Sequence, residues 1–275
     1  MEYNLEEIKE KAEYCLNCKT KPCTTGCPLQ NNIPDFINCI KEEKYEKAFE
    51  ILSGTTVFEP ICGRICPHKS QCEGKCVRGI KGESVKIGDL ETFVGDYALK
   101  YINNNISQIS NKKIAVIGSG PAGLACSYYL SQNGYKVALY EKHSKLGGLL
   151  RYGIPDFRLD KVLLDNWLEK FILNKNIQVY TNMELGKNLN LDELKEKNDV
   201  VILAFGANVS NKMGIEGEEN IFVLGGNELL EYGKMPDFQG KKVAIVGGGN
   251  VAMDVSRTIK KKGAEKVIIV YRRAE

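Results

Sequence analysis

Helical spacing of apolar residues dominates the first hundred residues. In the segment KYEKAFEIL, Tyr45, Ala48, Phe49 and Leu52 lie three or four positions apart, which predicts an amphipathic helix. The segments LEEIKEKAEYC and IPDFINCIKEE predict two further helices, and Pro34 stands near the start of the second. No alternating strand pattern of any length occurs in this part, and the polar run NNNISQISN after it predicts a linker.

From Lys112 onward, short apolar runs end in glycine turns. One series of segments begins at Lys112 and consists of KKIAVIG, GSGPAG, a helical stretch and KVALYEK. A second series begins at Lys241, 129 residues later, and consists of KKVAIVG, GGGNVA, a helical stretch and KVIIVYRR. This internal repeat predicts two nucleotide-binding units of parallel strands and helices. Between the repeats, IQVY, VVILAFG and IFVLGG predict further buried strands, and LDKVLLDNWLEKFIL predicts a helix.

The expected fold class is therefore α/β, with a helical domain before two Rossmann-like units. We expect boundaries at 1–105 for the helical domain, 112–210 for the first nucleotide-binding domain, 211–239 for a connection and 240–275 for the start of the second. A doubly wound domain needs more strands than this last stretch contains, so the second unit is predicted to be incomplete.

Composition narrows the class of protein. The 275 residues are 43% hydrophobic and 27% charged, and the net charge is only +3, with basic residues scattered along the chain. This pattern argues against a nucleic-acid-binding protein. No apolar stretch approaches the roughly 20 residues of a membrane span, and the charged N-terminus lacks the apolar core of a secretory signal, so we expect a cytoplasmic protein without membrane contact.

Cysteines concentrate near the N-terminus. Nine of the ten lie within the first 76 residues, where a reducing compartment disfavours disulfides. Eight of them form two runs, Cys15, Cys18, Cys23 and Cys27 before a proline, and Cys62, Cys66, Cys72 and Cys76. Such spacings are typical of 4Fe–4S clusters, and eight thiolates match two clusters. A zinc site is the alternative.

The remaining cysteines and the histidines carry weaker signals. Cys39 and Cys126 lie inside predicted helices and are expected to be small core residues. His68 and His143, the only histidines, are expected on the surface rather than as catalytic bases.

The first glycine turn has the spacing of a dinucleotide-binding fingerprint. Gly118, Gly120 and Gly123 follow a predicted strand and open a predicted helix, and Glu141 ends the next strand. Glycines there permit the tight turn, the approach of a pyrophosphate and close helix packing, while the acidic residue accepts hydrogen bonds from a ribose. Gly147 and Gly148 come where the pyrophosphate and ribityl chain of that cofactor would run.

The second glycine turn points to a different nucleotide. Its residues are Gly247, Gly248, Gly249, Asn250 and Val251, and Ala252 replaces the third glycine. Its second strand ends in Arg272 and Arg273, with no acidic residue. Adjacent guanidiniums suit the 2′-phosphate of NADPH, although two solvated arginines at a strand end are the alternative. Two cofactors in one chain suggest a flavin that is reduced by a nicotinamide, chemistry that needs no catalytic side chain.

The chain resembles the small (beta) subunit of NADPH-dependent glutamate synthase in the order of its motifs, which are the cysteine runs, GSGPAG, GGLLRYGIPDFRLDK and GGGNVAMD. It is also similar to the N-terminal half of dihydropyrimidine dehydrogenase and to the large subunit of electron-bifurcating ferredoxin:NADP oxidoreductases. The resemblance covers essentially the whole chain. It implies one 4Fe–4S cluster on Cys15, Cys18, Cys23 and Cys76, and a second on Cys27, Cys66, Cys72 and Glu91, which leaves Cys62 as a non-ligand.

The resemblance also implies the nucleotide contacts. FAD would bind at Gly118, Ser119, Gly120, Pro121, Ala122, Gly123, Glu141, Gly147, Gly148, Leu149, Arg158 and Leu189. NADPH would bind at Gly247, Gly248, Gly249, Asn250 and Val251, with Arg272 and Arg273 toward the 2′-phosphate. Phe205 departs from the family, which usually has threonine at that turn.

The function implied is electron input from NADPH through FAD and two clusters to a partner subunit. In the glutamate synthase interpretation the partner is a large (alpha) subunit with the glutaminase. In a second interpretation the chain is the large subunit of a bifurcating oxidoreductase linked to ferredoxin. A third is a truncated, non-catalytic docking module that binds clusters or zinc.

Overall fold

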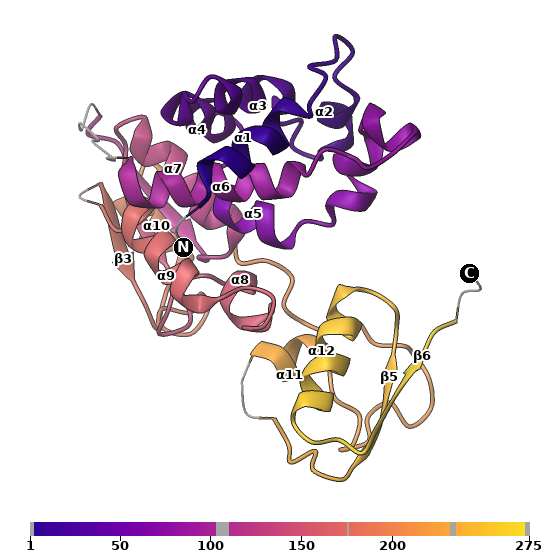
Figure 1. The fold of residues 1–275 in the computed structure, drawn as a ribbon. Coiled ribbons are helices and arrows are strands. Elements are labelled where there is room, and N and C mark those ends of the chain that lie inside the picture. Colours follow the sequence, from indigo (N-terminus) through magenta and orange to yellow (C-terminus); the bar gives the residue numbers. More distant parts are fainter. Residues whose placement is uncertain (1–2, 103–109, 175, 232–234, 273–275) are drawn as a thin grey trace. The chain divides into compact units, whose positions relative to one another are not determined.

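The computed structural model describes residues 3–102, 110–174, 176–231 and 235–272 (Figure 1). The chain divides into two compact units. One comprises residues 1–107 and 165–174, and the other comprises residues 108–164 and 175–275.

The first unit is helical, as the apolar spacing predicts. Its α-helices are α1 (Leu5–Glu13), α2 (Pro22–Gly26), α3 (Ile33–Lys41), α4 (Tyr45–Ser53), α5 (Glu59–Ile65) and α6 (Ile87–Tyr101). Three short 3₁₀ helices lie between α5 and α6, namely η1 (His68–Ser70), η2 (Glu73–Lys75) and η3 (Val77–Ile80). Buried apolar side chains such as Phe36, Ile40 and Leu90 form the core of this unit.

Helices α5 and α6 cross unusually closely because small residues face each other at the crossing. A Cβ added to Gly63 would lie 2.3 Å from the Thr92 hydroxyl oxygen, and one added to Gly95 would lie 2.3 Å from the Pro60 nitrogen. Larger side chains at these glycines would push the helices apart. The close crossing sets the position of the end of α5 relative to the middle of α6.

Residues 165–174 complete the core of the first unit. They include most of α9 (Lys161–Phe171). The indole nitrogen of Trp167 donates a 2.7 Å hydrogen bond to the Val57 carbonyl oxygen, and the Trp167 ring stacks on Phe58. The Phe171 ring stacks on Phe49. The sequence pattern alone assigned this segment to the nucleotide-binding part, whereas its aromatic side chains pack in the helical unit.

The second unit begins with a parallel sheet in the order β3–β2–β1–β4. Its strands are β1 (Lys113–Ile117), β2 (Lys136–Tyr140), β3 (Ile177–Tyr180) and β4 (Val200–Leu203), and the helices α7 (Pro121–Gln132), α8 (Leu149–Tyr152) and α10 (Leu191–Lys197) lie between them in the chain. β1 is central and buried from Ile114 to Ile117, which explains its continuous apolar sequence.

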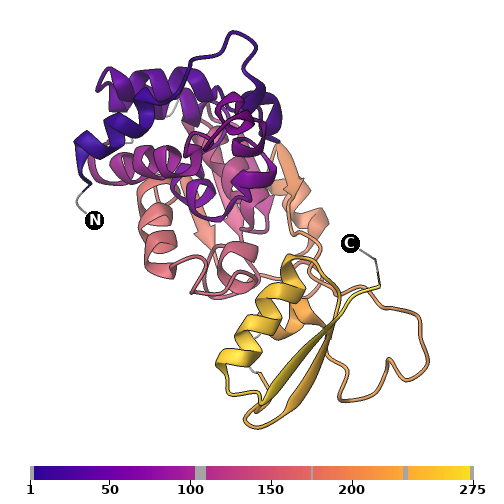
Figure 2. The same ribbon diagram turned by 45° about the vertical axis from the view of Figure 1, so that its right-hand side comes forward.

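The second repeat forms a smaller parallel sheet of β5 (Lys242–Val246) and β6 (Lys266–Val270), joined by α12 (Asn250–Lys261). Figure 2 shows α12 lying along this pair of strands. α11 (Gly226–Glu231) packs on α12, and Leu229, Phe238, Val255, Ile259 and Ala264 form the local core.

One predicted strand is wrong. The segment IFVLGG forms turns and irregular backbone that lead into α11, and Ile221 and Phe222 are 82% and 86% exposed. A short apolar run forms a strand only where a neighbouring strand accepts its hydrogen bonds. Among the described residues, none of the helices has the length and apolar character needed to cross a membrane.

Candidate functional site: two cysteine clusters and two glycine turns

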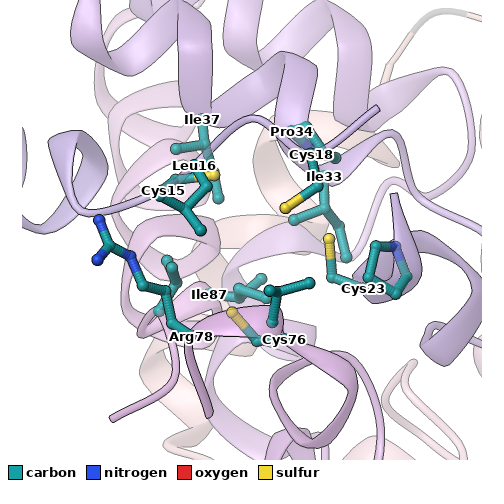
Figure 3. Close-up of a pocket in the computed structure, with 13 residues that line it drawn as sticks. Cys15, Leu16, Cys18, Cys23, Ile33, Pro34, Ile37, Cys76, Arg78 and Ile87 are labelled. Atoms are coloured by element: carbon teal, nitrogen blue, oxygen red, sulfur yellow. The ribbon is translucent and has the colours of Figure 1, made fainter. Parts of the chain in front are cut away.

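Four cysteines that are up to 61 positions apart in the chain line one pocket of the first unit. Cys15 and Cys18 lie in the loop after α1, Cys23 lies in α2, and Cys76 lies between η2 and η3. Figure 3 shows their side chains on different walls of the pocket. These are the four residues that the family resemblance assigns to the first cluster.

The rest of this pocket is mainly apolar. Ile33, Ile37, Val85 and Ile87 contribute to its walls. Burial, with smaller contributions from the neighbouring Cys15 and Cys76, raises the pKa of the Cys23 thiol to about 11. Thiolates in such surroundings are stabilised by a bound metal centre that carries positive charge, which also deprotonates the thiols.

Arg78 supplies the cation at the edge of the pocket. Its Nε donates a 3.0 Å hydrogen bond to the Tyr14 carbonyl oxygen, and its guanidinium carbon lies 4.2 Å from the centre of the Tyr14 ring. The Tyr14 hydroxyl in turn donates to the Glu83 carbonyl oxygen at 3.0 Å. Arg78 is therefore held in place at the pocket that the four cysteines line.

The second expected ligand set lies at the ends of short helices. Cys27 follows α2, Cys66 follows α5 and Cys72 precedes η2, while Glu91 lies in the middle of α6. Burial raises the pKa of the Cys72 thiol to about 12, and the charges of Glu91 and Cys27 contribute to this shift.

Cys62 differs from its neighbours. Its thiol is hydrogen bonded to Cys66, which raises the pKa of Cys62 and lowers the pKa of Cys66. The non-ligand role of Cys62 stays a prediction, because cysteine spacing alone does not distinguish it from a ligand role.

Glu91 is buried within the helical unit, with an exposed fraction of 5%. Burial raises the pKa of its carboxyl group, and the nearby His68 opposes that shift. The Asn31 amide donates to Glu91 Oε1 at 3.5 Å, and the Asn31 amide oxygen accepts a hydrogen bond from the Thr55 hydroxyl. The carboxylate is therefore oriented from one side by a neutral donor.

Sequence reasoning missed two buried groups beside this set. Glu59 is fully buried, its carboxyl oxygens have no hydrogen-bond partner among the described residues, and burial raises its pKa well above the ordinary value. His68, expected on the surface, has a side chain only 14% exposed. The pattern of apolar residues does not predict that the Glu59 and His68 side chains are buried, because both residues are polar and lie in short helices.

The four cysteines of the first set are spread around their pocket. Among the described residues, no group of three or more His, Cys, Asp or Glu side chains is arranged to hold one metal ion. In a 4Fe–4S cluster, each of four irons takes one protein ligand, so four ligands surround a volume and do not converge on a point. The four cysteines around the first pocket have this arrangement.

The first glycine turn is tightly packed. Gly118 has φ +103°, and a Cβ there would lie 2.5 Å from the Ala204 carbonyl oxygen. A Cβ on Gly123 would lie 1.8 Å from the Gly118 carbonyl oxygen, so only glycine lets α7 approach β1. Gly120, in contrast, faces open space, where backbone can approach a pyrophosphate.

The loop at Gly147 and Gly148 packs directly on this turn. The Gly147 N–H group donates to both the carbonyl and hydroxyl oxygens of Ser119 at 3.1 Å. Gly148 has φ +47°, and a Cβ there would lie 2.5 Å from the Gly120 Cα. The structure therefore brings together the two glycine motifs that the sequence separates by 27 residues, counted from Gly120 to Gly147.

Glu141 is already hydrogen bonded within the protein. Its Oε2 accepts from the Ser119 N–H group at 3.0 Å and from the Ser119 hydroxyl at 2.5 Å, and its Oε1 accepts from the His143 N–H group at 2.9 Å. His143, also expected on the surface, has a side chain 21% exposed, and its Nε2 lies 2.9 Å from Glu231 Oε1. A carboxylate has about four acceptor positions, so Glu141 retains one for a ribose hydroxyl.

The other expected FAD contacts differ in their surroundings. Pro121 and Ala122 form the first turn of α7, and Leu149, at the start of α8, is 56% exposed. Leu189 is buried in the core with Ala115 and Ile117. Arg158 forms a 2.6 Å ion pair with Asp254 of α12, an interaction that the motif did not predict. The contacts of Leu189 and Arg158 with FAD therefore stay predictions.

The second glycine turn is looser. Gly247 has φ +125° and donates to the Val270 carbonyl oxygen at 2.9 Å, and Gly249 precedes α12 with open space where a Cβ would project. Asn250 and Val251 begin the helix. A Cβ on Gly248 would lie 2.8 Å from the Tyr271 ring. Arg272 is exposed directly after β6, and Arg273 lies outside the described residues.

Two family models match the chain. Residues 1–103 match the 4Fe–4S cluster domain II of dihydropyrimidine dehydrogenase, and residues 112–275 match the pyridine nucleotide-disulphide oxidoreductases. The two matched regions meet within the polar run that predicts a linker.

Curated relatives extend over nearly the whole chain. The glutamate synthase (NADPH) small chain of Escherichia coli is 34% identical over 98% of this chain and 60% of its own length. The NADPH-Fe(3+) oxidoreductase subunit beta of Geobacter sulfurreducens is 38% identical over 93% of this chain and 39% of its own length. The chain therefore spans less than two thirds of these relatives.

A solved structure agrees with the fold. FprA of Mycobacterium tuberculosis in complex with NADPH matches 60% of this chain and 44% of its own, with a TM-score of 0.53 and 24% identity. Because one family model covers residues 112–275, more than half of the chain, the chain belongs to the pyridine nucleotide-disulphide oxidoreductase family.

Proposed function

We propose that this chain is the electron-input part of an NADPH-dependent oxidoreductase of the glutamate synthase small-subunit type. It would receive electrons from NADPH at FAD and pass them through two 4Fe–4S clusters to a partner subunit. The observation that carries the proposal is the assembly of Cys15, Cys18, Cys23 and Cys76 around one apolar pocket. A zinc-binding or purely structural module would not need both this set of four cysteines and a flavin-type glycine turn in the same chain.

The residues of the chain have distinct roles in this proposal. The open face at Gly120 and the start of α7 would hold the FAD pyrophosphate, and Glu141 would accept from its ribose. The open face at Gly249 and the start of α12 would hold NADPH, with Arg272 and Arg273 toward its 2′-phosphate. When bound, FAD accepts a hydride and the clusters accept single electrons.

Cluster ligation in the proposal follows the two cysteine sets. Cys15, Cys18, Cys23 and Cys76 would hold the first cluster, and Cys27, Cys66, Cys72 and Glu91 the second. The Cys62 thiol would donate to Cys66, and Arg78 would offset the negative charge of the first cluster. Hydrogen bonds and charges of this kind adjust the potential of a cluster.

Anaerobic purification tests the cofactor content. The full chain is expected to contain about eight irons, from two clusters, and one FAD. Cys76→Ser should lower the iron content to about four, because one cluster loses a ligand. Cys39→Ser is the matched control, since Cys39 lies in α3 outside the pocket lining, and it should retain all the iron. A chain that contains zinc and neither iron nor flavin would refute the proposal.

A titration with NADPH under the same conditions tests the input step. The flavin absorbance near its visible maximum should decrease as NADPH is added, whereas NADH should be a poorer donor because it lacks the 2′-phosphate. Flavin that stays oxidised at excess NADPH would contradict the NADPH part of the proposal.

The partner is proposed from the resemblance and the relatives. Co-expression with the adjacent genes of the source genome would identify it. A large subunit with glutaminase activity supports the glutamate synthase assignment, while a ferredoxin-linked subunit that binds NAD supports the bifurcating oxidoreductase.

A further inference from the structure

His68 has a buried ring nitrogen without a partner beside the proposed second cluster. It lies in η1, two residues after Cys66, and its side chain is 14% exposed. Its Nε2 has no hydrogen-bond partner among the described residues. The nearest charged oxygen is Glu91 Oε2 at 3.9 Å, beyond hydrogen-bond distance.

Contacts with the start of α6 hold the imidazole ring in this place. A Cβ added to Gly88 would lie 2.6 to 2.9 Å from three atoms of the His68 ring, so the ring occupies space that only glycine leaves free. The Gly88 N–H group donates a 3.0 Å hydrogen bond to Glu73 Oε1 of η2. Two points of contact, at His68 and at Glu73, thus fix the segment 66–73 on the helix that carries Glu91.

The Glu91 carboxylate has a different neighbour at each oxygen. The Asn31 amide donates to Oε1 at 3.5 Å, and His68 Nε2 faces Oε2 at 3.9 Å. A movement of about 1 Å would bring Nε2 to hydrogen-bond distance from Oε2. A buried donor without a partner costs about 1–3 kcal/mol, so an anionic ligand at this position gives His68 its missing acceptor.

We propose that His68 is a positioning residue for the second cluster: its Nε2–H group donates a hydrogen bond to the Glu91 carboxylate and orients that carboxylate as the cluster's oxygen ligand. This inference rests on the proposed function, since it requires a cluster on Cys27, Cys66, Cys72 and Glu91. Reduction adds one electron to the cluster and transfers no atom. A donor on the anionic ligand withdraws charge and stabilises the reduced cluster, so it raises the reduction potential.

The test is a redox titration of the anaerobically purified full chain, followed by electron paramagnetic resonance. In His68→Phe, which keeps a planar ring and removes both nitrogens, the ratio of reduced to oxidised second cluster at a fixed potential should fall about tenfold. For one electron this corresponds to about 59 mV. The first cluster in the same sample is the internal reference and should keep its potential.

Three further variants isolate the hydrogen bond. His68→Gln keeps an N–H donor and should recover most of the wild-type ratio. Gly88→Ala displaces the ring and should lower the ratio in the same direction as His68→Phe. His143→Phe, the same change at a histidine of the other unit, should leave both clusters unchanged.

Two results overturn the inference while leaving the proposed function intact. One is an unchanged second-cluster potential in a His68→Phe protein with about eight irons. The other is a strong nitrogen-14 coupling of the wild-type second cluster that disappears in His68→Gln, because His68 would then be the ligand itself. If the iron count shows that the wild-type chain has no second cluster, both the inference and the cluster assignment are overturned. If His68→Phe fails to fold, His68→Gln and Gly88→Ala still give opposite expectations for the potential.

Discussion

The two glycine turns follow strands of nearly the same sequence, KKIAVIG and KKVAIVG, yet they differ in packing. In the first turn, Gly123 leaves no room for a Cβ, and Gly148 from a separate loop presses on Gly120. In the second turn, Ala252 takes the place of the third glycine, with its Cβ 3.7 Å from the position of a Cβ on Gly247, an ordinary contact. A shared motif therefore does not fix how closely helix and strand approach.

The difference follows from what surrounds each turn. The first turn belongs to a four-stranded sheet and is joined to a second loop by Ser119 and Glu141. The second turn belongs to a two-stranded sheet, and its close neighbours among the described residues include Tyr271 and Gly226. Substitutions at equivalent positions should therefore have unequal effects.

The largest effect is expected for Gly123→Ala. The added Cβ would lie 1.8 Å from the Gly118 carbonyl oxygen, so α7 must move away from β1. Overpacking of this severity costs about 3 kcal/mol or more. Thermal unfolding of the second unit and the ratio of flavin to protein both measure it, and we expect nearly complete loss of flavin. A Gly123→Ala protein with normal flavin content would show that the turn is looser than described.

A smaller loss is expected for Gly148→Ala. The residue has φ +47°, and its Cβ would approach the Gly120 Cα at 2.5 Å. Left-handed backbone at a non-glycine residue costs about 1 kcal/mol, and the close contact adds about 1–3 kcal/mol. Urea unfolding should show this decrease, with weaker flavin binding, since the loop no longer closes on the first turn. Gly186→Ala is a useful control, because φ there is +84° but the space is open.

Ala252→Gly gives the second turn the glycine that the first turn has at the equivalent position, Gly123. Since the alanine fits without strain, glycine should lower stability by about 1 kcal/mol through its poor helix propensity. Chemical unfolding followed by circular dichroism measures this change. A stabilised Ala252→Gly protein would mean that the second turn is as tight as the first.

The smallest change in stability is expected for Gly120→Ala and Gly249→Ala. Both residues have extended backbone with negative φ, and no atom lies within 4 Å of an added Cβ. The free energy of unfolding without cofactor should stay within about 0.5 kcal/mol of the wild type. The added methyl group would nevertheless stand where a pyrophosphate must approach. Gly120→Ala should therefore lose FAD, and Gly249→Ala should weaken binding of NADPH, as measured by calorimetry.

The fold was largely predictable from the sequence because its signals are local. Strand, glycine turn and helix recur in the same order, and Gly118, Gly120 and Gly123 have the spacing that a tight turn requires. IFVLGG was the exception. Its composition suits a buried strand, but burial depends on a partner strand that the local sequence does not reveal.

The candidate sites were less predictable because they depend on tertiary contacts. Spacing indicated eight possible thiolate ligands, but it could not place Cys76 with Cys15, since 60 residues separate them. It also could not show that Gly88 leaves room for the His68 ring. These relations depend on how segments that are distant in the chain pack against each other, which no short motif specifies.

One lysine in the loop that carries the GIPDFRLDK motif has a further consequence. The Lys161 ammonium donates to the carbonyl oxygens of Leu150, Ile154 and Leu159 at 2.6 to 3.0 Å, and it has only three protons to give. The loop thus resembles a small chelate in which the ammonium group takes the place that a metal ion usually fills. Acylating reagents should react with Lys161 only after the loop opens, so its rate of chemical labelling reports the opening of this segment.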